Sequence, residues 1–176
     1  MRITKAVTSF VLCLLLILNF CACGNGVKPM ERLDTVSINV SASNAARGYL
    51  QAVLEEDETL FEKCFPDGVY RDYLGIEYFE KLSSFVSEAG YKFLGTRSGS
   101  VRALDEEYGE LYKDFRVDIA DSHNIDVNNI SDIQVVNTKT YLEVEGRNYS
   151  NDCYVIVYKY NDMWFAFNIT TLEDIK

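Results

Sequence analysis

The sequence predicts an α+β domain in which N-terminal helices pack on a curved C-terminal antiparallel sheet. Two observations carry this prediction. Apolar residues recur at helical spacing over much of residues 41–122. The last third of the chain is instead rich in Val, Ile, Thr, Tyr and Phe, as strands are. Because the helices come first and the strands last, an α+β arrangement fits better than an alternating α/β one.

The first helix is expected to begin at Ser41 or Ser43, either of which can serve as its N-cap. Its apolar stripe runs through Tyr49 to Leu54 and resumes after Asp57. The sequence Pro66-Asp67-Gly68 then predicts a stop and a turn.

Two further helices and a short strand complete the N-terminal part. The second helix is expected over about residues 76–89, with Gly90 at its end. Residues 91–94 favour a short strand. The third helix is expected from Val101 or Ala103 to about Ser122, weakened by about 1 kcal/mol at Gly109 relative to Ala.

The sheet is expected to contain strands over residues 133–145, 152–160 and 163–169, with Asn161-Asp162 as a hairpin turn that needs positive φ. The middle strand carries apolar side chains on both faces, so we expect it to be central and covered on both sides. The last strand is expected to present one apolar face, made of Met163, Phe165, Phe167 and Ile169.

The N-terminus has the pattern of an export signal. Residues 1–5 contain Arg2 and Lys5 and no acidic residue, and Phe10 to Leu18 is an unbroken apolar run. A membrane-spanning helix needs about 20 apolar residues, so this run is too short to be one. It fits the apolar region of a secretory signal peptide.

The sequence Phe20-Cys21-Ala22-Cys23-Gly24 resembles a bacterial lipobox. The resemblance implies that Cys23 is lipidated and becomes the new N-terminus on the outer face of the cell membrane. Cys21 is the competing position, and an ordinary cleaved signal is the alternative. The expected organisation is a signal peptide over 1–22, a tether over 23–39 and one domain over 40–176.

The formal net charge is −10, and removal of residues 1–22 takes away two cations and no acid, which leaves −12. Nucleic-acid binding needs clustered Lys and Arg, so this charge argues against such a partner. Anionic headgroups repel an acidic domain. A diacylglyceryl group, rather than the domain surface, is therefore expected to hold the protein at the membrane.

The order of elements also resembles the nuclear transport factor 2-like, or cystatin-like, superfamily, including domains on lipoproteins of Gram-positive bacteria. The likeness rests on AARGYLQAVLEEDETLFEKCF (residues 45–65) and YVIVYKYNDMWFAF (residues 154–167). It implies a cone-shaped domain. Isomerase-like members use an Asp base with Tyr and protonated Asp donors inside the cone, but no spacing here assigns an Asp to that role. Tyr49, Tyr78, Tyr154, Tyr158 and Trp164 are interpreted as core residues.

His123 is the only histidine, and its place at a helix exit favours a capping or solvated role over that of a catalytic base. The oxygen-rich residues Asp118, Asp121, Asp126, Asn128 and Asp132 do not have the spacing of a calcium loop. With one His and no CxxC in the mature domain, a zinc site is not expected either. No cofactor is predicted.

Cys64 and Cys153 are the cysteines left in the domain. Outside the membrane they can form a disulfide that closes a loop of about 90 residues. In the chain-entropy model such a disulfide stabilises the fold by roughly 4–5 kcal/mol. Cys64 lies on a helix stripe and Cys153 on a strand face, where Cys is often a small buried apolar residue. Free buried thiols are the favoured interpretation, and the disulfide stays an alternative.

Three hypotheses for function follow. The favoured one is a lipid-anchored extracytoplasmic domain without catalytic activity, which binds a protein partner or a small apolar ligand. The alternative is a cone-fold enzyme of the isomerase or dehydratase type acting on a small apolar substrate. A third is a regulatory module that controls a membrane partner.

Overall fold

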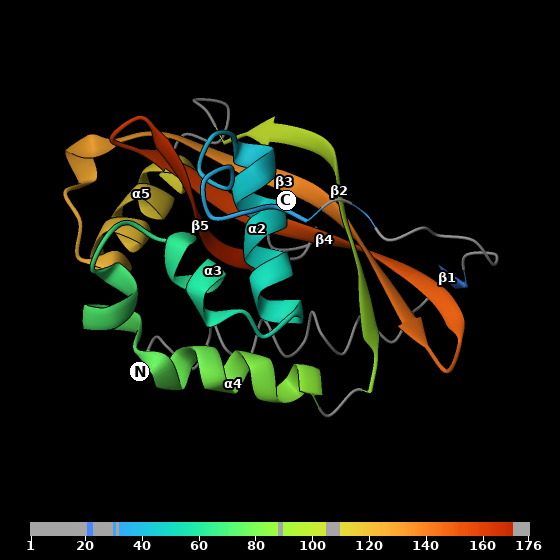
Figure 1. Cartoon of the computed structure of the whole chain (residues 1–176). Helices are drawn as coiled ribbons and strands as arrows, with labels where there is room; N and C mark the ends of the chain where they lie inside the picture. Colours follow the sequence, from blue (N-terminus) through green and yellow to red (C-terminus); the bar gives the residue numbers. More distant parts are fainter. Residues whose placement is uncertain (1–20, 23–29, 31, 88–89, 105–109, 171–176) are drawn as a thin grey trace.

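Strand β4 (Arg147–Tyr160) is the centre of an antiparallel sheet, as predicted. In the computed structural model, the described residues are 21–22, 30, 32–87, 90–104 and 110–170. β3 (Ile130–Val144) pairs with one edge of β4, and β2 (Lys92–Ala103) pairs with β3. β5 (Met163–Thr170) pairs with the other edge of β4, and the two-residue β1 (Cys21–Ala22) extends that edge at Ser150 and Tyr149 (Figure 1).

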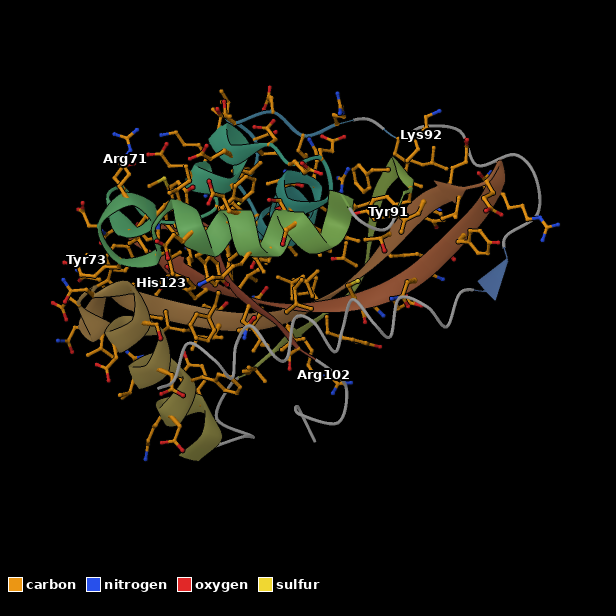
Figure 2. All side chains as sticks on the ribbon, turned by 90° about the horizontal axis from the view of Figure 1, so that it is seen from below. Arg71, Tyr73, Tyr91, Lys92, Arg102 and His123 are labelled. Atoms are coloured by element: carbon orange, nitrogen blue, oxygen red, sulfur yellow. The ribbon has the colours of Figure 1, made fainter. Side chains whose placement is uncertain are left out.

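Helices lie on both faces of this sheet. α2 (Ala42–Leu54), α3 (Glu58–Lys63) and α4 (Ile76–Ser87) cover one face, and α5 (Glu110–His123) lies on the other (Figure 2). Two short helical segments complete the domain, the π-helix η1 (Tyr70–Leu74) and the 3₁₀ helix η3 (Val127–Asn129). The α+β class and the double coverage of β4 are therefore confirmed.

Local chemistry fixes the helix starts and the hairpin. Ser41, rather than Ser43, is the N-cap of α2, since its hydroxyl accepts a hydrogen bond from the Asn44 N–H at 3.1 Å. Asp57 caps α3 in the same way through the Leu60 N–H at 2.9 Å. Asn161 and Asp162 have φ of 48° and 66°, the left-handed conformation that the predicted turn requires.

The segment between α4 and α5 departs from the prediction. β2 continues to Ala103, so residues 101–103 are strand and do not begin a helix. α5 is described from Glu110, and Tyr108 and Gly109 lie outside the described residues. β2 is an edge strand with two register shifts, and most of its side chains beyond Thr96 are exposed. Beyond Thr96 the strand has no buried face, so it shows no apolar alternation there for a sequence pattern to detect.

The apolar side chains divide into two cores, one on each face of the sheet. The α2-side core contains buried side chains of α2 and α3 together with the inward face of β4. Its members include Tyr49, Leu50, Val53, Leu60, Phe61, Phe65, Tyr70, Phe79, Leu82, Val155 and Val157. The α5-side core is smaller and consists of Leu104, Ile119, Ala120, Ile130, Ile133, Val135, Ile156, Tyr158 and Phe165.

The aromatic residues predicted to be structural pack into these cores. Tyr49 and Tyr158 are fully buried, and Tyr78, Tyr154 and Trp164 are partly buried against the core residues. The predicted single apolar face of β5 is wrong. Phe165 belongs to the α5-side core and Ile169 to the α2-side core, because a register shift between Ile156 and Val157 of β4 changes the alternation of β5.

The predicted tether is largely docked on the domain. The Met30 N–H donates to the Leu94 carbonyl at 2.9 Å. The Gln51 amide holds Leu33 through two hydrogen bonds, of 3.0 and 3.1 Å. Ile38 is completely buried against Gly48 of α2. Parts of the predicted tether over 23–39 are thus packed on the domain at Met30, Leu33 and Ile38, while residues 23–29 lie outside the described residues, as do the charged start and apolar run of the expected signal.

None of the helices among the described residues is long and apolar enough to cross a membrane.

Candidate functional site

His123 lies inside the protein, which corrects the prediction of a capping or solvated side chain. It is 2% exposed, and its Nδ1 lies 2.7 Å from the hydroxyl oxygen of Tyr158 in β4. The rings of Phe65 and Phe167 pack on the imidazole, with centroid distances of 5.4 and 5.6 Å. Figure 2 shows His123 near Tyr73, where η1 and α5 meet. The imidazole therefore joins the two cores at one end of the sheet.

A sequence signal for this burial existed. His123 comes four residues after Ile119 and so continues the apolar stripe of α5 by one helical turn. Tyr158 has the same phase on β4 as Ile156, which belongs to the α5-side core. The polar neighbours of His123 in sequence obscured this phase.

Burial lowers the pKa of His123 to about 4, since no opposite charge compensates for the lost hydration. The imidazole is therefore neutral at pH 7. Burial raises the pKa of Tyr158, so the phenol is neutral as well. A general base must reach the proton that it removes. Two neutral partners enclosed by aromatic rings form a structural hydrogen bond rather than an exposed acid–base pair.

Cys64 and Cys153 are free and buried in the structure. The Cys64 thiol donates to the Leu60 carbonyl at 3.3 Å, and burial raises its pKa. Cys153 Sγ lies 3.9 Å from Thr140 Oγ1. A thiol with a raised pKa is a poor nucleophile. Cys23, the predicted lipidation site, lies outside the described residues.

The oxygen-rich segment supplies a local cap. Asp126 Oδ1 accepts hydrogen bonds from the backbone N–H and the side-chain amide of Asn128, both at 2.9 Å, and so begins η3. Within the described residues, no group of three or more His, Cys, Asp or Glu side chains is placed to hold a metal ion.

Two surface hollows of different charge lie beside α2. The acidic hollow, of about 620 Å³, lies at the C-terminal end of α2 and is lined by Arg32, Leu33, Gln51, Glu55, Glu56, Asp57, Glu58 and Thr59. The arginine hollow, of about 410 Å³, lies toward the N-terminal end and is lined by Met30, Ser43, Asn44, Arg47, Thr96, Arg97 and Ser98.

The acidic hollow already contains a cation. Arg32 Nε donates to Glu55 Oε1 at 2.7 Å, and the neighbouring Gln51 is occupied by its two hydrogen bonds to Leu33. These contacts attach the N-terminal segment to α2. The acidic hollow is therefore part of the docking of residues 32–33.

Among the described residues that line the arginine hollow, none carries a carboxylate. Arg47 Nε donates to Thr96 Oγ1 at 3.4 Å, and Ser98 Oγ donates to the Ser43 carbonyl at 3.4 Å, so side chains tie β2 to α2 across it. Sequence reasoning missed this hollow. Its two arginines come from a helix and an edge strand 50 positions apart, and no local pattern connects them.

No protein-family model, curated protein or solved structure matches the chain.

Proposed function

We propose that this protein is a lipid-anchored domain on the outer face of a bacterial cell membrane that acts by binding rather than by catalysis. The carrying observation is the sequence Phe20-Cys21-Ala22-Cys23-Gly24 after a short apolar run, which resembles a lipobox with Cys23 as its acyl acceptor. Two acyl chains on one cysteine give a durable anchor, whereas a single chain binds reversibly.

The docked N-terminal segment supports a short connection between anchor and domain. Met30 is hydrogen-bonded to β2, and it lies seven positions after Cys23. A chain of seven residues spans at most about 25 Å. Lipidation of Cys23 would therefore hold Met30, and the surface around it, close to the lipid headgroups. Cleavage before Cys23 removes β1, which contributes only two residue pairs at the end of β4.

The packing of the interior supports binding over catalysis. Phe61 lies at the centre of the α2-side core, with ring centroids 4.8 to 6.2 Å from Tyr49, Phe65, Tyr70, Tyr78 and Phe79. These rings fill the α2-side core with side chains, whereas a cone-fold enzyme needs an open cavity for its substrate. His123 and Tyr158 are likewise enclosed by side chains. Both hollows instead open at the surface.

A cystatin-like, cone-shaped fold remains part of the proposal. The long helix α2 packed across an antiparallel sheet supports it, and so does the long β3–β4 hairpin (Figure 1). α5 on the opposite face is an addition to that pattern.

Cysteine variants of the full chain, expressed in a bacterial host, test the anchor. With Cys23→Ala we expect loss of acyl labelling and either accumulation of the uncleaved precursor or release of the protein from the membrane fraction. The matched control is Cys21→Ala, which leaves processing intact if the cut precedes Cys23. Inhibition of lipoprotein signal peptidase should reproduce the unprocessed form. Normal acylation of Cys23→Ala with loss in Cys21→Ala would move the site to Cys21, and no acylation of the wild-type chain would refute the anchor.

A further inference from the structure

We propose that the arginine hollow binds the phosphate group of a lipid headgroup beside the anchor. This inference rests on the proposed function, because the anchor is what brings the hollow to the membrane. It assigns to an otherwise acidic domain one surface that faces the bilayer.

The chemistry of the lining favours a phosphate. Arg47 and Arg97 supply guanidinium groups, whose planar donor arrangement matches phosphate oxygens. Ser43, Thr96 and Ser98 add hydroxyl groups. Arg97 is exposed and forms no ion pair with any of the residues that the structure describes.

The local field adds to this preference. The first turn of α2, which contributes Ser43 and Asn44 to the hollow, carries no acidic residue. The positive end of the helix dipole is therefore not neutralised within its own turn. With a mature charge of −12, most of the surface repels anionic headgroups. A phosphate in the hollow would instead lie beside Arg47 and Arg97, and none of the described lining residues is acidic.

Hydrogen bonds preorganise the side chains that line the hollow. Thr96 is 4% exposed and accepts a hydrogen bond from Arg47 Nε, which positions that guanidinium against β2. The Ser98–Ser43 hydrogen bond fixes β2 relative to the start of α2. Side chains that are held before binding lose less conformational entropy when the ligand arrives.

The arginine hollow lies where the N-terminal segment meets the domain. Met30 lines the hollow and is bonded to Leu94 of β2, so the chain from the anchor reaches the domain at this hollow. Since Cys23 is at most about 25 Å of extended chain away, the headgroups around the anchor are the phosphates at the highest local concentration. The acidic hollow lies at the other end of α2 and is occupied by the Arg32–Glu55 pair.

The test uses the full-length lipidated protein in liposomes and measures amide hydrogen exchange over residues 43–47 and 94–98. We expect exchange to be roughly tenfold slower in phosphatidylglycerol liposomes than in phosphate-free glucosyl diacylglycerol liposomes. This is the protection expected when the local headgroup concentration is about ten times the Kd of the hollow for the headgroup. Arg47→Gln and Arg97→Gln should each remove most of this difference.

Arg102→Gln is the matched control. Arg102 lies on the same strand as Arg97, is exposed and does not line the hollow, so this variant makes the same change in charge and should keep the protection (Figure 2). Because Arg97 is exposed, Arg97→Gln tests the hollow without disturbing a buried contact. Urea unfolding verifies that Arg47→Gln and Arg97→Gln remain folded.

Equal protection in both kinds of liposome, or protection that survives in the Arg97→Gln and Arg47→Gln variants, would overturn the proposal. If inorganic phosphate gives full protection in glycolipid liposomes, the ligand of the hollow is free phosphate, and the assignment to a lipid headgroup is overturned. Flotation with the liposomes reports the anchor separately. A protein that floats but shows no protection lacks the headgroup site, whereas a wild-type chain that is never acylated and does not float refutes the proposed function.

Discussion

The two cores share one sheet but differ in chemistry. The α2-side core is large, and its interior is dominated by aromatic rings and aliphatic side chains. The α5-side core is smaller and adjoins the buried hydrogen bond between Tyr158 and His123. One core is therefore stabilised almost entirely by burial and close packing, while the other depends in addition on the protonation state of one imidazole. The following experiments test this difference.

The largest expected effect is from Phe61→Ala in the α2-side core. Phe61 is fully buried among five aromatic rings, so truncation removes apolar contact and leaves a cavity. We expect a loss of about 3–5 kcal/mol in the free energy of unfolding. Urea unfolding followed by the fluorescence of Trp164, the single tryptophan, measures it. Val117→Ala, at an exposed position of α5, is the control and should change stability by less than about 0.5 kcal/mol. A similar small loss for Phe61→Ala would show that this core is loosely packed.

The next effect is a pH dependence that belongs to the α5 side. The pKa of His123 is about 4 in the folded state and 6.5 when unperturbed. Above pH 6.5 both states are neutral and the full stability is present. Between pH 6.5 and about 4 the unfolded state binds the proton and the folded state does not, so stability falls as pH falls, by about 3 kcal/mol in total. Below about 4 this contribution is constant.

The variant His123→Phe/Tyr158→Phe isolates this contribution from that of the carboxylates. Replacing both partners removes the imidazole without leaving a buried polar group unpaired, whereas Tyr158→Phe alone leaves the imidazole unpaired at a cost of about 1–3 kcal/mol. The difference between the wild-type and double-variant curves of unfolding free energy against pH should show the loss described above. Parallel curves from pH 7 to pH 4 would mean that His123 is accessible to protons in the folded state.

Sequence patterns predicted the α2-side core better than the α5-side core for a physical reason. The residues of α2 and β4 that fill the first core are apolar and repeat with helical or strand periods, which is the signal that burial leaves in a sequence. The double-sided β4 and the positive-φ turn at Asn161-Asp162 were predicted on the same basis.

The features that sequence reasoning missed depend on distant partners. His123 is buried because Tyr158, 35 positions later, accepts or donates its hydrogen bond, and the polar residues next to it predicted exposure. Residues 32–39 have few apolar side chains, yet Gln51 and Gly48 of α2 provide the places for Leu33 and Ile38. The arginine hollow combines Arg47 with Arg97 only after β2 packs on α2.

A smaller effect is expected from Gly48→Ala, which tests how tightly the N-terminal segment closes the α2-side core. A Cβ atom on Gly48 would lie 2.8 Å from Cγ2 of Ile38, which is fully buried. Overpacking of this kind costs about 1–3 kcal/mol, and the higher helix propensity of Ala returns up to about 1 kcal/mol. We expect a net loss of stability together with faster hydrogen exchange at residues 33–38. Ala52→Gly, the reverse exchange at another buried position of α2, is the comparison: it reports the propensity term together with the loss of one buried methyl group, and it adds no new contact. A stabilised Gly48→Ala would mean that Ile38 moves aside freely.

The smallest expected effect concerns the two cysteines, both in the α2-side core. The structure holds Cys64 and Cys153 as free thiols. A disulfide between them would close a loop of about 90 residues and stabilise the fold by roughly 4–5 kcal/mol. With free thiols, a reducing agent should instead leave the free energy of unfolding unchanged within about 0.5 kcal/mol, and alkylation after denaturation should label both cysteines. Incubation with a mild oxidant should also leave it unchanged, because burial raises the pKa of Cys64 and keeps it as a thiol. A drop in stability on reduction would show that the α2-side core depends on a covalent bond. The two cores would then no longer differ in the way described above, because neither would be stabilised by packing alone.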